Sequence, residues 1–342
     1  METILIEGQN GNSAIIVDER IEELAKYLPK KKLFIITDKN VEKHYTTVFP
    51  EAPFFSINPG EASKRLGYIE SIYRWLLENN ADRTSFMLGI GGGVVCDIAG
   101  FVASTYMRGV EFGFVSTSLL SQVDASVGGK NGVDLDGYKN IIGTFTQPRF
   151  VLCDTRLLKT LPHEELVNGF AEMVKHAIIL DIKLFEQLEH DCIALLNLNQ
   201  PEISKHIAES IRVKASIVTA DERESGIRKL LNFGHTWGHA VETLTGISHG
   251  KAVSIGMEFA CRLSMEKGLI GNKEYLRVIN LLQSCGLPTR MNIEPNKVFD
   301  ALVKDKKQNA NSIDFVLLKG IGVPKIETMA LEELKKFAEK RL

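Results

Sequence analysis

Residues 85–106 read SFMLGIGGGVVCDIAGFVASTY, and this stretch decides the fold class. Residues 85–93 are typical of a buried strand that runs into glycines, and residues 94–106 are typical of a helix of small side chains. Glycines let a backbone come close to a phosphate, and a helix N-terminus offers N–H donors. The spacing is not G-x-G-x-x-G, so the junction alone also fits a structural turn that binds nothing.

The same alternation of strand and helix continues on both sides of this junction. Strand-like runs occupy residues 32–38, 111–117 and 149–154, and residues 65–80 carry apolar side chains at helical spacing. This alternation predicts an α/β domain with a mostly parallel sheet and a nucleotide-type site at the carboxyl ends of its strands.

Helical patterns dominate from about residue 156 onward. A single strand-like run is expected within residues 300–322. We therefore predict an α/β domain over residues 1–155 and a mainly helical domain over residues 156–342. The helices are expected at residues 161–180, 183–196, 201–219, 236–245, 251–267 and 273–284.

The composition limits the class of protein. The chain has 342 residues, is 44% hydrophobic and 25% charged, and carries a net charge of -2, which argues against a broad nucleic-acid surface. Its five scattered cysteines include no C-x-x-C pair, which favours reduced thiols. Neither a signal peptide nor an apolar run of transmembrane length is evident. We expect a cytoplasmic protein without nucleic-acid or membrane partners.

Residues 116–140 are rich in glycines and hydroxyls and include Asp124, Lys130, Lys139 and Asn140. The apolar run at residues 119–123 indicates that part of this segment is buried, and buried charges need partners or a ligand. A solvated loop is the competing interpretation.

Residues 169–176 place Glu172, Lys175 and His176 on one helix face. Their spacing alone favours a surface ion pair.

Two histidines, His235 and His239, have the i, i+4 spacing at which two imidazoles can meet one metal. On its own such a pair is more often structural. A third histidine, His249, and the helix-borne Glu172 strengthen the metal interpretation, since two histidines and a carboxylate form a common catalytic zinc set. Polar residues recur here at intervals of four, four, three and four, although two glycines interrupt a continuous helix: Glu224, Arg228, Asn232, His235 and His239.

Taken together, these stretches resemble the 3-dehydroquinate synthase family of sugar phosphate cyclases, over nearly the whole chain. The family shares its fold with glycerol dehydrogenase and iron-type alcohol dehydrogenases. The matching motifs are PGEASK (59–64), GGGVVCD (91–97), TYMRG (105–109), STSLLSQVDASVGGKNGVD (116–134), KNIIGTF (139–145), GFAEMVKH (169–176), VKASIVTADERE (213–224), LNFGHTWGHAVE (231–242), SHGKAVSIGM (248–257) and DKK (305–307).

The resemblance implies a lyase of the shikimate pathway, which leads to the aromatic amino acids. The substrate is a phosphorylated seven-carbon keto acid, 3-deoxy-D-arabino-heptulosonate 7-phosphate, and the products are 3-dehydroquinate and phosphate. The implied sequence is transient oxidation by NAD+, phosphate elimination, re-reduction and intramolecular aldol closure.

The resemblance also implies the site residues. Zinc, for which cobalt can substitute, is held by Glu172, His235 and His249. NAD+ lies on the N-terminal domain at Asp38, Asn40, Glu61, Lys64, Gly92, Gly93, Val94, Asp97, Thr117, Ser118, Lys139, Leu157, Thr160 and Asn168. The substrate meets Arg108, Asp124, Lys130, Asn140, Lys175, Lys214, Arg228, Asn232, His239 and one or both of Lys306 and Lys307.

Four of these residues are expected to take part in the chemistry. Asp124 and Lys175 orient hydroxyls, whereas Glu224 and His239 carry protons. His239 is thereby separated from the metal ligands. The family also implies a homodimer in which Arg108 reaches the neighbouring subunit's site.

Two positions depart from the family pattern. Cys96 replaces the last glycine of the usual GGGVVGD, and a small side chain fits there if its φ is negative. Thr117 and Ser118 replace a pair of threonines, which keeps both hydroxyls. His176 matches no family site and is interpreted as structural.

Three other functions compete with this one. Another sugar phosphate cyclase, such as 2-deoxy-scyllo-inosose synthase, would act on a different sugar phosphate. A polyol dehydrogenase of the same fold would release NADH. A catalytically dead NAD-binding sensor would lack competent site residues, whereas every expected position here carries one.

Overall fold

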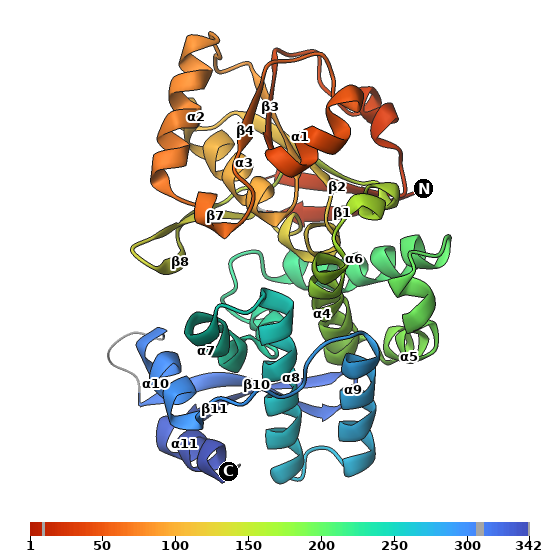
Figure 1. Ribbon diagram of the computed structural model, residues 1–342, viewed down its shortest axis with the longest axis vertical. Coiled ribbons are helices and arrows are strands. Elements are labelled where there is room, and N and C mark those ends of the chain that lie inside the picture. The colour runs from red at the N-terminus through yellow and green to blue at the C-terminus, as the bar shows by residue number, and fades with distance from the viewer. Residues whose placement is uncertain (9–10, 306–310, 341–342) are drawn as a thin grey trace. The chain divides into compact units, whose positions relative to one another are not determined.

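A seven-stranded sheet forms the centre of the first of two units in this computed structural model (Figure 1). The structure describes residues 1–8, 11–305 and 311–340. Unit 1 comprises Met1–Leu166 and Ile203–Arg223, and unit 2 comprises Val167–Glu202 and Glu224–Leu342.

The strands of unit 1 run in the order β1-β2-β9-β6-β5-β3-β4. Only the β1–β2 pair is antiparallel, so the mostly parallel sheet predicted from the sequence is confirmed. The bounds are β1 (Glu2–Gly8), β2 (Gly11–Val17), β3 (Leu33–Asp38), β4 (Phe54–Ile57), β5 (Phe86–Gly91), β6 (Glu111–Ser116) and β9 (Phe150–Cys153).

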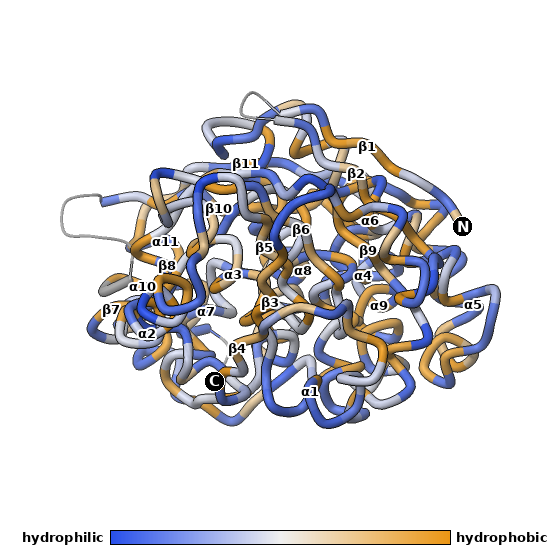
Figure 2. The backbone as a smooth tube through the Cα atoms, turned by 90° about the horizontal axis from the view of Figure 1, so that it is seen from above, coloured by the Kyte–Doolittle hydropathy of each residue, from blue (hydrophilic) through white to orange (hydrophobic). Residues whose placement is uncertain are grey.

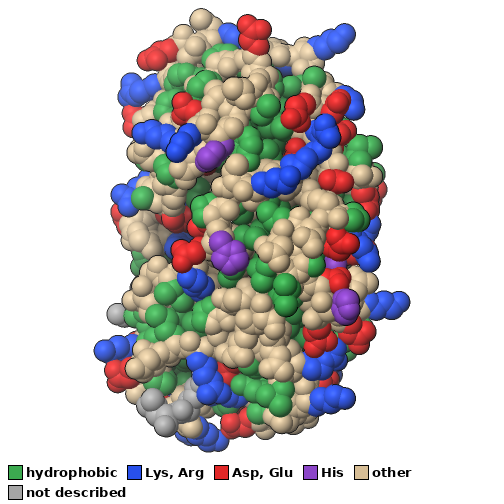
Figure 3. Space-filling view, turned by 45° about the vertical axis from the view of Figure 1, so that its right-hand side comes forward, with side chains coloured by type: hydrophobic (Ala, Val, Ile, Leu, Met, Phe, Trp, Pro, Cys, Tyr) green, Lys and Arg blue, Asp and Glu red, His purple; other side chains and the backbone are tan. Residues whose placement is uncertain are grey.

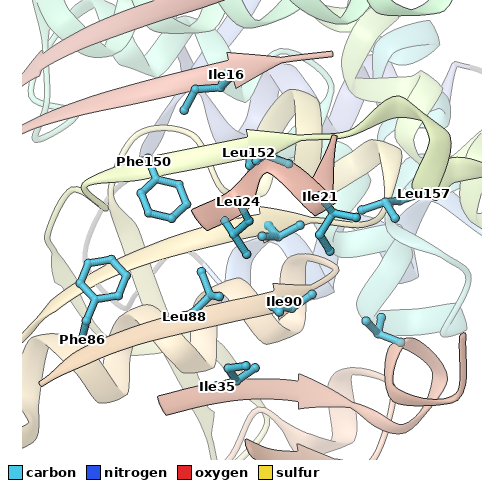
Figure 4. Close-up of a cluster of buried hydrophobic side chains, with 12 residues drawn as sticks. Ile16, Ile21, Leu24, Ile35, Phe86, Leu88, Ile90, Phe150, Leu152 and Leu157 are labelled. Atoms are coloured by element: carbon cyan, nitrogen blue, oxygen red, sulfur yellow. The ribbon is translucent and has the colours of Figure 1, made fainter. Parts of the chain in front are cut away.

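Strand β5 is buried along its whole length between β3 and β6. A parallel strand covered on both faces is expected to be continuously apolar, as the hydrophobic colouring of β5 in Figure 2 shows. Buried side chains from β2, β3, β5 and β9 form one cluster, which the short helix η1 (Ile21–Lys26) joins through Ile21 and Leu24 (Figure 4). Within it the rings of Phe86 and Phe150 stack with their centroids 6.1 Å apart.

The helices of unit 1 follow its strands, as the alternating pattern predicts. Helix α3 begins directly after β5, so the glycine-rich junction stands at the carboxyl end of a central strand. The helices are α1 (Lys39–Tyr45), α2 (Leu66–Glu78), α3 (Gly93–Thr105) and most of α6 (Glu202–Ala220).

One hairpin of unit 1, β7 (Lys130–Leu135) with β8 (Tyr138–Phe145), begins within residues 116–140, for which the sequence predicts no strand. Most of β8 is exposed, so its sequence lacks the alternation of apolar and polar residues that marks a half-buried strand.

Unit 2 is mainly helical, as predicted. It also contains the antiparallel hairpin of β10 (Ser312–Gly320) and β11 (Val323–Ala330), of which only β10 was expected from the sequence. Its helices are α4 (His163–Leu180, from Val167 onward), α5 (Ile182–Leu196), α7 (His235–Thr245), α8 (His249–Glu266), α9 (Asn272–Ser284), α10 (Pro295–Asp305) and α11 (Leu331–Glu339).

The compact units differ from the predicted boundary at residue 155. The chain extends unit 1 to Leu166, and most of α6 belongs to this unit. Side chains explain that attachment, because Arg212 pairs with Glu2, and Lys214 Nζ lies 2.6 Å from Asp124 Oδ1. The division into domains of residues 1–155 and 156–342 stays a prediction.

The surface agrees with the near-neutral composition. On the face drawn in Figure 3, basic and acidic side chains alternate, with apolar ones between them. Among the helices that the structure describes, none is both long enough and apolar enough to cross a bilayer.

Candidate active site

A carboxylate and two imidazoles converge within unit 2. Glu172 lies in the middle of α4, His235 is the first residue of α7, and His249 is the first residue of α8. Glu172 Oε1 lies 3.5 Å from His235 Nε2 and 3.5 Å from His249 Nε2. These three residues can hold a metal ion, since their ligand atoms all lie within 4.8 Å of one another.

The three residues fit a catalytic zinc or cobalt ion. Ligand atoms bonded to zinc at about 2 Å stand roughly 3–3.5 Å apart in a tetrahedral shell, which matches the spacing seen here. The Glu172 side chain is fully buried, and a buried carboxylate needs cationic or hydrogen-bonding partners. Three protein ligands leave a fourth position for water or substrate.

Glycine contacts fix where the two histidines stand. Gly234, immediately before His235, has a φ of 79°, and a Cβ there would lie 2.8 Å from the Val253 carbonyl oxygen of α8. A Cβ on Gly256 of α8 would lie 1.8 Å from the Gly234 carbonyl oxygen. Only glycines allow this approach, so the backbone of α8 touches the turn that presents His235.

Both histidines have an acceptor near their second ring nitrogen. His235 Nδ1 lies 3.2 Å from the Phe233 carbonyl oxygen, and His249 Nδ1 lies 3.3 Å from Glu242 Oε2. A proton on Nδ1 satisfies such an acceptor and leaves the Nε2 lone pair for a metal. Sequence reasoning missed Glu242, although it stands seven residues before His249 in the GHAVE motif.

The two histidines differ in basicity when no metal is bound. Burial alone would lower the pKa of His249, but hydrogen bonds and charge from Glu172 and Glu242 raise it to about 9. Burial and the nearby Lys175 ammonium hold the pKa of His235 well below its usual value. A metal therefore has to displace a proton from His249 but not from His235.

His239 lies beside this centre, and its ring centroid is 5.2 Å from that of His235. His239, Glu242 and His249 form an alternative group that could hold a metal. In that group the carboxylate is Glu242, which faces Nδ1 of His249. Glu172, in contrast, faces the Nε2 atoms of both His235 and His249. The geometry therefore favours the Glu172 set.

Lys175 forms an ion pair with Glu172, and both side chains are buried. The prediction of a surface ion pair is therefore wrong. An i, i+3 spacing shows that two residues share a helix face, but it does not show whether that face is buried. A buried pair has little freedom to separate, so Lys175 is held next to the Glu172 carboxylate.

Three polar residues precede α7. Glu224 Oε1 accepts a hydrogen bond from Asn232 Nδ2 at 2.6 Å. Arg228 belongs to the short helix η7 (Ile227–Asn232) and is only 2% exposed. A break at Gly234 separates η7 from α7, so the polar residues do not share one continuous helix face.

In unit 1, the glycine-rich junction has the form of an anion cradle. Gly92 caps α3 and Gly93 begins it, with Val94 next. A Cβ on Gly92 would lie 3.2 Å from Ser118 Oγ, which lies at the end of β6 together with Thr117. The positive end of a helix and open backbone approach suit a phosphate group.

Cys96 is accommodated within this junction. It lies inside α3, 1% exposed, with Sγ 4.0 Å from the Gly91 carbonyl oxygen. Burial raises the pKa of its thiol. Cys96, which stands where the family has glycine, therefore places an uncharged, buried thiol beside the glycine-rich junction.

Other predicted nucleotide residues surround the carboxyl ends of the strands. Asp38 caps α1, and Oδ1 accepts from the Asn40 amide at 2.8 Å. Lys64 Nζ lies 2.7 Å from Asp97 and 3.4 Å from Glu61. Burial raises the pKa of Asp97 to about 6, against the opposing charge of Lys64.

Two predicted positions, Leu157 and Thr160, lie within the short helix η6 (Thr155–Thr160). The hydroxyl of Tyr45 lies 3.0 Å from the Leu157 carbonyl oxygen and 2.5 Å from Thr160 Oγ1. Asn168, by contrast, belongs to unit 2, where its side-chain oxygen accepts from the Gly250 amide in the first turn of α8.

The remaining predicted substrate residues have varied surroundings. Arg108 is exposed and has a φ of 70°, and Lys130 is exposed at the start of β7. Asn140 has a φ of 51°, and its amide donates to Asp134 at 2.7 Å; it follows Lys139 on β8. Lys306 and Lys307 lie outside the described residues.

Comparison with known proteins identifies the family. The model of the 3-dehydroquinate synthase N-terminal region matches residues 54–168, and that of the C-terminal region matches residues 169–308. The 3-dehydroquinate synthase of Thermoanaerobacter pseudethanolicus is 41% identical over 331 residues, which cover 93% of each chain.

Two solved structures resemble this one over their whole length. The 2-deoxy-scyllo-inosose synthase complexed with carbaglucose-6-phosphate, NAD+ and Co2+ is 25% identical, with a TM-score of 0.88 and full coverage of both chains. The 2-epi-5-epi-valiolone synthase of Streptomyces hygroscopicus subsp. jinggangensis, with NAD+ and Zn2+ bound, is 26% identical, with a TM-score of 0.86 and 99% coverage of both.

The basicity of His249 predicts a pH-dependent metal affinity. Because its pKa is about 9 without metal, each pH unit below that value should weaken Zn2+ binding about tenfold, as the proton competes for the same nitrogen. Titration against a chromophoric chelator between pH 6.5 and 8.5 should show a dissociation constant that falls about a hundredfold. A constant value across this range contradicts the assignment of His249 as a ligand.

The contact between Glu242 and His249 predicts a role in metal retention. Glu242→Ala removes the acceptor that orients the His249 ring, and Zn2+ affinity should fall about 10–100-fold. Glu242→Gln keeps an acceptor oxygen, so its Zn2+ affinity should fall less than that of Glu242→Ala. Thr243→Ala, at the next and exposed position of α7, is the matched control and should bind zinc like the unmodified protein. Equal zinc affinity in all three variants would show that Glu242 is not needed.

Proposed function

The chain belongs to the 3-dehydroquinate synthase family, and we propose that it converts 3-deoxy-D-arabino-heptulosonate 7-phosphate to 3-dehydroquinate and phosphate. The observation that carries this proposal is the convergence of Glu172, His235 and His249 beside the buried Lys175. Phosphate elimination from a keto acid develops negative charge on oxygen, which a metal centre of this kind and neighbouring charged residues can stabilise.

We propose NAD+ and Zn2+ as the cofactors, with Co2+ able to replace zinc. The related cyclases that hold NAD+ with Co2+ or Zn2+ support this pair. When bound, nicotinamide supplies reversible hydride transfer and the metal supplies Lewis acidity toward alkoxide and enolate oxygens. In unit 1 the anion cradle at Gly92 and Gly93 is the proposed position of the cofactor's phosphates.

The substrate carboxylate is assigned to Arg228. Its guanidinium has planar N–H donors that match a carboxylate in a bidentate pair. Lysines 306 and 307 remain proposed contacts from the family pattern. This proposed contact favours the keto acid over a sugar phosphate that has no carboxylate.

The departing phosphate is assigned to Arg108, Lys130 and Asn140, whose positive or donating groups stabilise its negative charge. His239 is the proposed proton carrier, because its imidazole lies beside the proposed metal ligands, 5.2 Å from the His235 ring centroid, and an imidazole can act as a general acid or base. Glu224 is the second proposed carrier, positioned by its 2.6 Å hydrogen bond from Asn232.

Two residues are assigned to orientation of the substrate hydroxyls. Lys175 is held by its ion pair with Glu172, and Asp124 is held by Lys214 at 2.6 Å. Fixed partners of this kind keep a side chain in one position, which is what positioning of a reacting hydroxyl requires.

We further propose a cytoplasmic homodimer in which Arg108 serves the neighbouring subunit. Arg108 is exposed, and its positive φ of 70° follows that of Met107 at 49°, so it stands in a strained turn at the surface of its unit. All five cysteines are free thiols, as a reducing compartment would keep them.

Phosphate release tests the function directly. Purified protein with Zn2+, catalytic NAD+ and the heptulosonate phosphate should release one phosphate per substrate without net NADH, because the redox steps cancel. Glucose 6-phosphate should give no release. Release from glucose 6-phosphate alone would assign the chain to the inosose synthases, and net NADH formation would assign it to the polyol dehydrogenases.

Two histidine variants separate ligand from proton carrier. His235→Ala should lose bound zinc and activity together, whereas His239→Ala should retain zinc and lose kcat by about 10²–10⁴-fold, the usual contribution of general acid–base catalysis. Metal content by atomic emission and turnover are measured on the same samples. Zinc loss in His239→Ala with retention in His235→Ala would reverse the ligand assignment.

A further inference from the structure

Two buried cysteines of unit 2, neither of them a proposed metal ligand, face each other. Cys192 lies on α5, and Cys285 immediately follows α9. Their Sγ atoms are 3.0 Å apart, and the residues are 3% and 0% exposed. A disulfide bond is about 2.05 Å long, so the two sulfur atoms need to approach by only about 1 Å to form one.

The helices that carry the two thiols are held together around them. Arg277 of α9 makes a two-pronged contact with Glu189 of α5, through Nε at 3.0 Å and Nη2 at 2.5 Å. The same guanidinium carbon lies 5.2 Å from the centroid of the Phe185 ring. These contacts restrain both helices, so the juxtaposition of the sulfur atoms is a property of the α5–α9 packing.

The pair is also suited to attack on an oxidant. The two Sγ atoms share a hydrogen bond in which either thiol can be the donor. This contact lowers the pKa of Cys192, whereas the same contact and burial raise the pKa of Cys285. Cys192 is therefore the better thiolate and Cys285 the resolving thiol.

We propose that Cys192 and Cys285 form a site of covalent oxidation, at which hydrogen peroxide converts two thiols to a disulfide. The Cys192 thiolate attacks one peroxide oxygen, the O–O bond breaks, and Cys192 becomes a sulfenic acid as water leaves. Cys285 then attacks that sulfur, the S–S bond forms, the S–O bond breaks, and a second water leaves. Two thiols are oxidised by two electrons, and one hydrogen peroxide is reduced to two water molecules.

The cross-link joins residues that are 93 positions apart. A bridge across so long a loop restricts the unfolded chain and stabilises the folded one. The site thus links oxidation to the stability of unit 2, and it does so independently of the catalytic assignment.

The test uses the full-length protein, reduced, desalted and treated with hydrogen peroxide at pH 7.5. Free thiols are then alkylated, and the unreduced digest is analysed by mass spectrometry. A peptide that links Cys192 to Cys285 should form at least tenfold faster than any modification of Cys261, which is also buried and whose pKa burial raises. The intact mass should fall by two hydrogens, the melting temperature should rise by several degrees, and dithiothreitol should reverse both.

Single variants distinguish the roles of the two thiols. Cys285→Ala should stop at a sulfenic acid on Cys192, which dimedone traps, whereas Cys192→Ala should react no faster than Cys261. If either variant fails to fold, as judged by circular dichroism, the linked peptide of the unmodified protein still decides. Recovery of both cysteines as free thiols, or of Cys192 as sulfinic acid without a linked peptide, overturns the proposal.

Discussion

The burial of one carboxylate constrains the whole of unit 2. Glu172 is completely covered, yet it stands among Lys175, His235 and His249. A charge out of water is tolerated only where its partners are fixed, and removal of one partner from such a group costs several kcal/mol. Helix α4 must therefore keep its position against the beginnings of α7 and α8, and the turns before both helices must keep their shape.

Much of the fold could be predicted from the sequence, because its core elements carry strong periodic signals. Strand β5 and helices α2 and α3 were expected close to their observed bounds. A strand buried on both faces requires a continuous apolar run, and α2 carries apolar residues at helical spacing. The exposed hairpin of β7 and β8 imposes no such pattern. The placement of α6 with unit 1 depends on contacts distant in sequence, as between Arg212 and Glu2, which local patterns do not encode.

The candidate site was predictable only in part. The i, i+4 spacing showed that His235 and His239 could face one metal. It could not show which of them binds the metal and which only lies beside it. That distinction came from the family resemblance, and the 3.5 Å approach of Glu172 Oε1 to the Nε2 atoms of His235 and His249 supplies an independent geometric reason. Glu242 carried no signal of its own, because an acidic residue on a helix is usually a solvated one.

The glycine contact between Gly256 and the turn at Gly234 bears on the order in which this centre is assembled. Backbone meets backbone there without any side chain between, so α8 and the start of α7 are locked by main-chain packing. The imidazoles are thus set in place by protein atoms alone. In small zinc-dependent folds, metal binding drives folding, and the apoprotein is unfolded without the ion. Here the ion would bind after the protein has folded, and it could be exchanged without unfolding the protein.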